Sequence, residues 1–461
     1  MGAAWRLTEL GFNDWILYER NNSLGGLASS EVDESGFTWD LGGHVLFSHY
    51  DYFDRVMNLA INDDGWLNHK RESFIWFEDN FIPYPFQYSF SQCSPDIARD
   101  CLTGLIDAAT NKNSESPKNY RDWITATFGR GIAKHFMEPY NEKVWACAPE
   151  YMDHKWIGER VAIPNLIDVI ESKKKINTTW GPNNTFRFPA AGGTGSIWNS
   201  VVSKIDSLLI GKNQKISSKI RLETEVTALY TDRREMVIKS GPQRDLVQYE
   251  HVINTSPLDT FVGAICLGLP SQTRQLSSLF RHSTTHVIGI GLHGSPCDRL
   301  ATKSWMYFHQ IGIPFYRATV FSNYSAANTP DGCWSIMVEV SESHSKRVDS
   351  GQVVEKVIQS LISMGFIDGL DQVSSKYHKI LDYGYPTPFI ERANFLDGLL
   401  DDLVELGIYS RGRFGAWKYE VSNQDHSFMQ GVEAVDAILY GRDEITVQHP
   451  EVANQIRRAR Q

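Results

Sequence analysis

Gly36-Phe37-Thr38-Trp39-Asp40-Leu41-Gly42-Gly43-His44-Val45-Leu46-Phe47-Ser48-His49-Tyr50 is the stretch that decides the fold. Ahead of it stand an apolar run over 15–18, an acid at Glu19 and a glycine turn over 24–27. An acid at a strand end can hold the ribose hydroxyls of an adenosine, and glycines let the backbone approach a flat cofactor. We interpret this pattern as an FAD-binding Rossmann domain. The cofactor contacts predicted here are Glu19, Gly25, Gly26, Gly42 and Gly43.

The beginning of the sequence departs from this pattern. A flavin-binding Rossmann domain ordinarily opens with a strand and a G-x-G-x-x-G turn whose N–H groups hold the pyrophosphate. Gly2 stands where the third glycine of that turn belongs, at the start of the first expected helix. We therefore expect the first strand and the first two glycines to be missing. Losing a central parallel strand is costly, because such a strand contributes two ladders and a buried face.

Composition bounds the class of protein. A chain of 461 residues is long enough for two or three domains, and 42% hydrophobic with 22% charged residues is ordinary for a globular protein. The net charge of −10 argues against nucleic acid as a partner, although a few cleft arginines would still bind a phosphate-bearing ligand. None of the six cysteines forms a C-x-x-C pair, so we expect a cytoplasmic protein without a metal site. No apolar run is long enough to span a membrane, so we expect no membrane partner.

The distribution of helix and strand patterns predicts interleaved domains. Residues 88–175 are helical in pattern, whereas strand-like runs return at 215–260 and 285–340. The predicted fold class is α/β, with a Rossmann-like FAD domain interleaved with a helical domain and an antiparallel β-sheet domain. The predicted boundaries are 1–70, 187–265 and 405–461 for the FAD domain, 88–186 for the helical domain, and 71–87 with 266–404 for the sheet domain.

The C-terminal segment 411–428 concentrates glycine and polar residues before an expected helix, where N–H groups and amides can contact a ring system. With it, a series of blocks resembles the eukaryotic UDP-galactopyranose mutases over almost the whole chain. These blocks are GGHVLFSHYDYFD (42–54), PYPFQ (83–87), FMEPYNEKVWA (136–146), GERVAIPN (158–165), WGPNNTFRFPAAGGTG (180–195), THVIGIGLHGS (285–295), PFYRATVFSNYS (314–325), YGYPTP (383–388) and RGRFGAWKYEVSNQDHSFMQGVEAVD (411–436).

The resemblance implies an isomerase that interconverts UDP-galactopyranose and UDP-galactofuranose without net redox change. In this family N5 of the reduced flavin attacks the anomeric carbon and expels UDP, and a covalent adduct lets the sugar ring open and reclose. FAD is the implied cofactor and NADPH the implied reductant. The implied partners are the two UDP-sugars, and the pattern is also compatible with a homo-oligomer.

The resemblance also implies roles for individual residues. Arg160 and Arg317 match the pyrophosphate arginines, which suits the fork geometry of guanidinium; the alternative for Arg160 is a surface ion pair with Glu159 or Glu142. His44 falls in the loop against the isoalloxazine ring and Asn183 in a loop that reaches galactose. These four form the predicted catalytic set, and Arg71 aligns with an arginine near the NADPH and flavin region.

Aromatic and amide residues complete the predicted substrate site. Phe136, Met137, Asn141 and Trp145 fall at spacings that place the last two on one helix face if the helix continues past Pro139, as a plain core stripe would also do. The predicted uridine, phosphate and sugar contacts are Tyr84, Gln87, Phe136, Met137, Asn141, Trp145, Trp305, Tyr307, Tyr324, Tyr385 and Tyr419. The further predicted flavin contacts are Val226, Arg413, Asn423, Gln424 and Ser427.

Two other functions fit parts of the pattern. The first is a non-catalytic UDP-sugar-binding relic with impaired flavin binding, which the missing N-terminal strand motivates; it predicts a colourless protein that binds UDP. The second is a flavin oxidase of the amine or protoporphyrinogen type, which predicts substrate-dependent hydrogen peroxide and no UDP binding.

Overall fold

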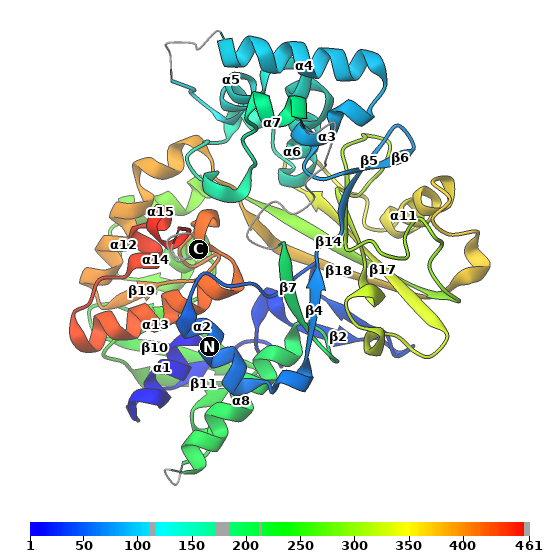
Figure 1. Ribbon diagram of the computed structural model, residues 1–461. Coiled ribbons are helices and arrows are strands. Elements are labelled where there is room, and N and C mark those ends of the chain that lie inside the picture. The colour runs from blue at the N-terminus through cyan, green and yellow to red at the C-terminus, as the bar shows by residue number, and fades with distance from the viewer. Residues whose placement is uncertain (111–115, 172–183, 212–213, 456–461) are drawn as a thin grey trace.

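The computed structural model describes residues 1–110, 116–171, 184–211 and 214–455. Over these ranges the fold is mixed α/β, as predicted. Figure 1 shows a group of helices at the top, a large sheet on the right, and a second α/β region at lower left that holds both the first helix and the last helices. None of the helices in the described ranges is long and apolar enough to cross a membrane.

The large sheet has seven strands in the order β18-β14-β17-β16-β15-β5-β6. All its neighbouring pairs are antiparallel except β15 with β5. Its strands are β5 (Ser73–Phe77), β6 (Asn80–Pro83), β14 (His282–His293), β15 (Trp305–Phe308), β16 (Arg317–Val320), β17 (Cys333–Glu342) and β18 (Val373–Pro386). The pattern predicts five of these strands, at 73–78, 81–84, 286–293, 305–308 and 334–340, and these are confirmed within a few residues.

The two faces of β17 pack against different side-chain clusters. Side chains alternate across a strand, so Val338 and Val340 point to one face and Met337 and Glu339 to the other. The first face packs with α11 (Val353–Ser363) in an aliphatic core. The second face meets a smaller aromatic cluster that includes Phe37 and Trp39. A carboxylate in the middle of a buried strand is therefore placed on the aromatic face.

The helical group sits at one end of the sheet (Figure 1). It contains α3 (Phe86–Ser89), α4 (Pro95–Thr110), α5 (Tyr120–Ile132), α6 (Glu138–Trp145) and α7 (Leu166–Glu171). A π-helical turn, Ala133–Met137, joins α5 to α6. Proline has no N–H and is tolerated in the first turn of a helix. Pro139 lies in the first turn of α6, so the helix continues past Pro139 to Trp145.

The second α/β region is built from short strands. Two parallel pairs, β1 (Leu17–Tyr18) with β8 (Ile220–Arg221) and β12 (Val252–Asn254) with β19 (Ile408–Ser410), form separate sheets. A four-stranded sheet has the order β11-β10-β9-β13. Its strands are β9 (Thr224–Tyr230), β10 (Glu235–Ser240), β11 (Gln243–Gln248) and β13 (Cys266–Leu267).

Helices from both halves of the chain pack around these strands. They are α1 (Gly2–Leu10), α2 (Asp51–Ala60), α8 (Gly195–Ile210), α9 (Leu258–Thr260), α10 (Ser271–Gln275), α12 (Leu396–Glu405), α13 (Gln424–Tyr440), α14 (Ile445–Gln448) and α15 (Pro450–Ala453). The first helix begins at Gly2, as predicted, and packs against α8 and α13. Two antiparallel pairs, β2 (Ser30–Val32) with β3 (Thr38–Asp40) and β4 (Trp66–Lys70) with β7 (Thr185–Pro189), form separate two-stranded sheets.

Candidate active site

A cavity of about 1810 Å³ is lined by residues from all three regions. Tyr84 and Arg160 come from the helical group, Trp305 and Arg317 from the large sheet, and Ser427 from α13. Sites for one small ligand occupy roughly 300–1000 Å³. This cavity therefore has room for a large cofactor and a substrate side by side.

Two glycines shape the wall in which the sequence predicts the flavin. Gly25 has φ +105° and Gly42 has φ +126°, a backbone conformation that other residues rarely adopt. A Cβ at Gly25 would also lie 2.9 Å from Cδ1 of Trp198. These positions accept only glycine without strain, so the chain can turn tightly around the cavity. Glu19 lines the same wall and holds the N–H of Asn21 at 2.8 Å.

Several buried polar atoms at this site lack a hydrogen-bond partner among the described residues. They include Nδ1 of His44, Nη1 of Arg160, Nε1 of Trp305 and Oε1 of Gln424. All four residues line the cavity. Buried polar groups in native proteins are almost always paired, so an unpaired group calls for a ligand or water. The N-terminus of α13, with Asn423 as its N-cap, also lines the cavity and presents N–H groups. The residues present therefore fit a polar cofactor such as FAD.

Arg317 is held by a buried carboxylate. It lies directly opposite Glu339 in the ladder between β16 and β17. Its Nε donates to Oε1 at 3.1 Å and its Nη2 to Oε2 at 2.8 Å. Glu339 also accepts bonds from the Tyr316 hydroxyl and, at 2.7 Å, from the Gly43 N–H. Burial alone would raise the pKa of Glu339, but these partners, Arg317 foremost, hold it below its usual value.

Arg160 and Arg413 also line the cavity. Arg160 makes one long bond, 3.4 Å to the Tyr419 carbonyl, and its guanidinium lies 5.3 Å from the Tyr419 ring. Arg413 donates to the Gly384 carbonyl at 3.1 Å and stacks over Tyr385 at 4.7 Å. The structure shows no ion pair between Arg160 and Glu142 among its described contacts, so the alternative of a surface pair is not supported for Glu142. Arg160 is thus free to meet an anion.

The phenols in the cavity stay protonated. Burial raises the pKa of Tyr84, Tyr307 and Tyr385 above the ordinary value. Tyr84 and Tyr307 lie with ring centroids 4.8 Å apart, and Tyr385 lies 5.8 Å from Tyr419. These rings provide flat apolar walls, and their hydroxyls can donate to phosphate or sugar oxygens.

His44 is neutral at neutral pH. Burial lowers its pKa to about 4; Glu339 opposes this shift, whereas Arg413 and Arg317 add to it. An imidazole in this state cannot serve as a permanent positive charge toward a phosphate. Its place in the cavity wall agrees with a role in the shape and hydrogen bonding of the flavin loop rather than in charge.

The cavity gathers most of the predicted site residues. Those that line it are Glu19, Gly25, Gly26, Gly43, His44, Tyr84, Arg160, Val226, Trp305, Tyr307, Arg317, Tyr385, Arg413, Tyr419, Asn423, Gln424 and Ser427, together with Arg71. Gly42 and Tyr324 lie beside lining residues but do not line it themselves. Asn183 lies outside the described residues.

The predicted uridine contacts on the helical side lie one layer behind the wall. Gln87, Phe136, Met137, Asn141 and Trp145 are buried and do not line the cavity as described. Gln87 donates to the Ala162 carbonyl at 2.6 Å, and Asn141 donates to the Met137 carbonyl at 2.7 Å. Trp145 lies edge-on to Tyr419 at 4.8 Å. In this conformation these residues support the lining aromatics, and their contact with a ligand stays a prediction.

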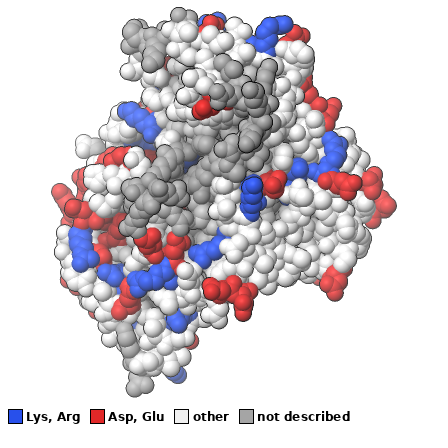
Figure 2. Space-filling view, viewed as in Figure 1, with Lys and Arg blue, Asp and Glu red and all other residues white. Residues whose placement is uncertain are grey.

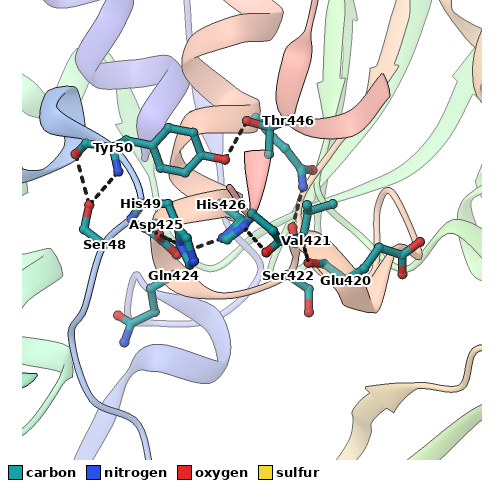
Figure 3. Close-up of polar contacts among 12 residues, drawn as sticks. Ser48, His49, Tyr50, Glu420, Val421, Ser422, Gln424, Asp425, His426 and Thr446 are labelled. Carbon is teal, nitrogen blue, oxygen red and sulfur yellow. Dashed lines mark hydrogen bonds and ion pairs between the residues drawn. The ribbon is translucent and has the colours of Figure 1, made fainter. Parts of the chain in front are cut away.

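Sequence reasoning missed Glu339. The available signal was one acid inside the apolar strand Ile336-Met337-Val338-Glu339-Val340. It also missed the hydrogen bonds of His49 and His426 with Asp425, which Figure 3 shows beside Ser48 and Tyr50. Both sets join residues hundreds of positions apart, so no local pattern reveals them.

Charged side chains of both signs occur on the surface and in the cavity lining. Figure 2 shows basic and acidic side chains interspersed over the face in view. The cavity lining is mixed as well: its basic residues are Arg20, Arg71, Arg160, Arg317, Arg413 and Lys379, and its acidic residues are Asp14, Glu19, Glu31, Glu223, Glu250 and Asp382. The net charge of −10 therefore does not exclude an anionic ligand, because Arg160 and Arg317 both reach the cavity.

Comparisons with known proteins bear on the family and the fold. A family model for flavin containing amine oxidoreductases matches residues 1–288. The structure resembles that of a reduced UDP-galactopyranose mutase, with 42% identity, a TM-score of 0.92 and coverage of 98% of this chain and 94% of that one. A putative protoporphyrinogen oxidase from Exiguobacterium sp. 255-15 (13% identity, coverage 96% and 96%, TM-score 0.69) and a cyclohexylamine oxidase from Brevibacterium oxydans (14%, 95% and 96%, 0.65) share the fold.

Proposed function

The chain belongs to the UDP-galactopyranose mutase family and carries a flavin containing amine oxidoreductase domain, and from this premise we propose that it interconverts UDP-galactopyranose and UDP-galactofuranose. The enzyme class is then an isomerase. The observation that carries the proposal is the cavity of about 1810 Å³, whose lining combines the glycine turn at Gly25 and Gly26 with the arginines Arg160 and Arg317. An amine oxidase needs the first feature but has no use for several arginines facing its substrate.

The arginines would hold the diphosphate while it is detached from the sugar. Guanidinium forks bind phosphate oxygens through two parallel bonds. Arg160 has a buried Nη1 without a partner among the described residues, so this nitrogen can donate a hydrogen bond to a phosphate oxygen. Arg317 would share its charge between Glu339 and the incoming phosphate. Keeping the leaving diphosphate at this place allows it to return after the sugar ring has changed.

The flavin would lie against the wall formed by Gly42–His44 and the first turn of α13. Glu19 and Val226 would hold its adenosine end, and Arg413, Asn423, Gln424 and Ser427 its ring end. When bound and reduced, the flavin supplies N5 as the nucleophile that displaces UDP from the anomeric carbon. The backbone around Gly43, fixed by Glu339, would set the distance between this wall and the sugar.

The aromatic side chains would orient the sugar and exclude water. Tyr84 and Tyr307 provide one wall, and Trp305 offers an indole N–H without a partner among the described residues. The neutral phenols can donate hydrogen bonds to hydroxyls or phosphate oxygens without adding charge. For the reductant we propose NADPH, whose phosphates would meet Arg71 at the cavity wall.

A chromatographic assay tests the proposed function. Purified protein is supplied with FAD and UDP-galactofuranose, with and without dithionite, and UDP-galactopyranose is measured. We expect conversion only under reducing conditions, because the proposed chemistry needs the reduced flavin. Absence of conversion by a protein that is fully loaded with reduced flavin contradicts the proposal.

Two further measurements distinguish the mutase from the non-catalytic relic and from the flavin oxidase. The relic predicts that UDP binds to a protein that takes up no FAD, which calorimetry and the visible spectrum distinguish. The oxidase predicts hydrogen peroxide from an amine or a porphyrinogen, together with no heat of UDP binding. UDP binding by a yellow protein that makes no peroxide supports the mutase.

A further inference from the structure

A buried network of two histidines and one aspartate joins distant parts of the chain. His49 donates from Nδ1 to Oδ2 of Asp425 at 2.7 Å, and its backbone N–H reaches the same oxygen at 2.9 Å. His426 meets the other oxygen, Oδ1, from its Nδ1 at 3.0 Å. The three side chains are at most 3% exposed. Figure 3 shows both rings converging on the Asp425 carboxylate.

Both ring nitrogens of His426 lie within hydrogen-bond distance of oxygen atoms. The Nδ2 of Asn454 donates to the carbonyls of Glu420 and Pro450, at 3.0 and 2.8 Å, so its Oδ1 must face Nε2 of His426, at 3.2 Å. With Asp425 ionised, both ring nitrogens of His426 face acceptors, an arrangement that favours the protonated ring. Burial acts to raise the pKa of Asp425, but the charge of His426 and the bonds from His49 hold it at about 2.

This network connects two walls of the cavity. His49 ends the loop that begins with Gly42–His44, and Asp425 lies in the first turn of α13, between Gln424 and Ser427. Gly43, His44, Gln424 and Ser427 all line the cavity. A second, weaker bond runs from Gln424 Nε2 to the Val45 carbonyl at 3.5 Å. The carboxylate also benefits from the N-terminal end of the helix dipole.

We propose that His49, Asp425 and His426 form a positioning clamp that holds the Gly42–Tyr50 loop on the N-terminus of α13 and so sets the geometry of the flavin-facing wall. None of the three side chains lines the cavity as described, so they would act through the loop and the helix. The inference rests on the proposed function, because it assumes that this wall receives FAD. It adds three positioning residues to that site.

Four variants test the clamp. Asp425→Asn places an amide N–H against one of the two donors, and His49→Leu removes the donor from the loop. His49→Asn keeps an N–H near the position of Nδ1 and should restore the bond. Glu342→Gln is the matched control, because Glu342 bonds the buried ring of His286 at 2.8 Å on the large sheet and does not line the cavity.

Two measurements are made on each full-length variant. The first is the FAD dissociation constant by flavin fluorescence, with the visible circular dichroism of the bound flavin. The second is hydrogen exchange of the amides over 42–50, where the His49 N–H reports on the clamp directly. We expect Asp425→Asn and His49→Leu to weaken FAD binding by at least about tenfold and to speed exchange of that amide. His49→Asn should stay within about threefold of the natural protein, and Glu342→Gln should match it.

Three outcomes overturn the proposal. One is a folded Asp425→Asn protein whose FAD affinity, flavin dichroism and loop exchange all equal those of the natural protein. Another is an equal loss in His49→Leu and His49→Asn. The third is a stoichiometric metal ion in the natural protein that is lost in Asp425→Asn, since the same donor atoms lie within 4.8 Å of one another. If the natural protein binds no FAD, the proposed function fails, whereas exchange of the loop still tests the clamp.

Discussion

Arg317 and Glu339 face each other across two antiparallel strands and share a bidentate ion pair, with bonds of 3.1 and 2.8 Å. The same carboxylate accepts the Gly43 N–H from the loop on the predicted flavin side. One acid thus touches the arginine that would meet the substrate's diphosphate and the backbone that would meet the cofactor. An incoming phosphate competes with Glu339 for the guanidinium, so the two halves of the site are electrostatically linked.

We predict that UDP stabilises a Glu339→Gln variant more than it stabilises the natural protein. Removing the carboxylate leaves Arg317 without its counter-charge and should lower the free energy of unfolding by about 3 kcal/mol. The diphosphate would then supply the missing negative charge. Thermal unfolding with and without UDP measures the effect, with Glu342→Gln on the same strand as control. An equal shift by UDP in both variants argues against the link.

Arg317→Ala should weaken UDP binding by about 2–4 kcal/mol and abolish turnover, because a charge-assisted contact is lost and Glu339 is left to repel the phosphate. Calorimetry with UDP measures the first effect. Arg299→Ala is the control, because Arg299 stacks on Trp76 at 4.7 Å and does not line the cavity. The double variant Arg317→Ala with Glu339→Gln should regain stability but not UDP affinity. Unchanged UDP affinity in Arg317→Ala would remove this residue from the site.

Arg160→Ala should separate binding from stability. Its guanidinium makes a long bond of 3.4 Å to the Tyr419 carbonyl, lies 5.3 Å from the Tyr419 ring, and leaves a buried Nη1 without a partner among the described residues. The free energy of unfolding should change by no more than about 0.5 kcal/mol. UDP affinity should fall by about 1.5–3 kcal/mol, as expected for a hydrogen bond to a charged group. A large loss of stability without loss of UDP affinity would show that Arg160 serves the fold instead.

Glu433 on α13 should make stability fall as the pH rises. Burial raises its pKa from 4.5 to about 7, although two bonds from Thr446 oppose the shift. Because the folded-state pKa is the higher one, its stabilisation is complete below pH 4.5 and is lost as the pH rises through 7. The shift corresponds to about 3 kcal/mol.

Glu433→Gln mimics the protonated side chain and should remove this dependence. Denaturant unfolding at pH 5 and pH 7.5 tests it. The variant should gain stability relative to the natural protein as the pH increases, by up to about 3 kcal/mol. An equal difference between the two proteins at both pH values would contradict the shift.

The sequence predicts those helices and strands whose apolar residues recur with a regular helix or strand periodicity. The strand at 334–340 and the helix at 427–439 are confirmed, as β17 and α13, with ends that extend by up to three residues. The strand β18 was not predicted, because Lys376, His378 and Lys379 interrupt its alternation. It forms the edge of the sheet, where polar side chains are tolerated on both faces. Its fourteen residues are held by pairing with β14, which no local pattern reveals.

Residues that belong to a family motif could be assigned to the cavity from the sequence. Residues whose position depends on tertiary contacts could not. Arg160, Tyr419 and Ser427 come together at the cavity from three distant motifs. The predicted uridine-side residues Phe136 and Trp145 share their spacing with a core stripe, and in this conformation they pack behind the wall. Glu339 acquires its meaning only from the strand beside it, through a register that the sequence does not encode locally.

The clamp between His49 and Asp425 has a consequence for the nascent chain. The two residues are 376 positions apart. At roughly 5–20 residues per second, a ribosome makes the second on the order of tens of seconds after the first. During that interval the Gly42–Tyr50 loop has been synthesised, but its partner Asp425 has not. If the clamp sets the flavin-facing wall, the complete wall forms only near the end of translation, after α13 has been synthesised.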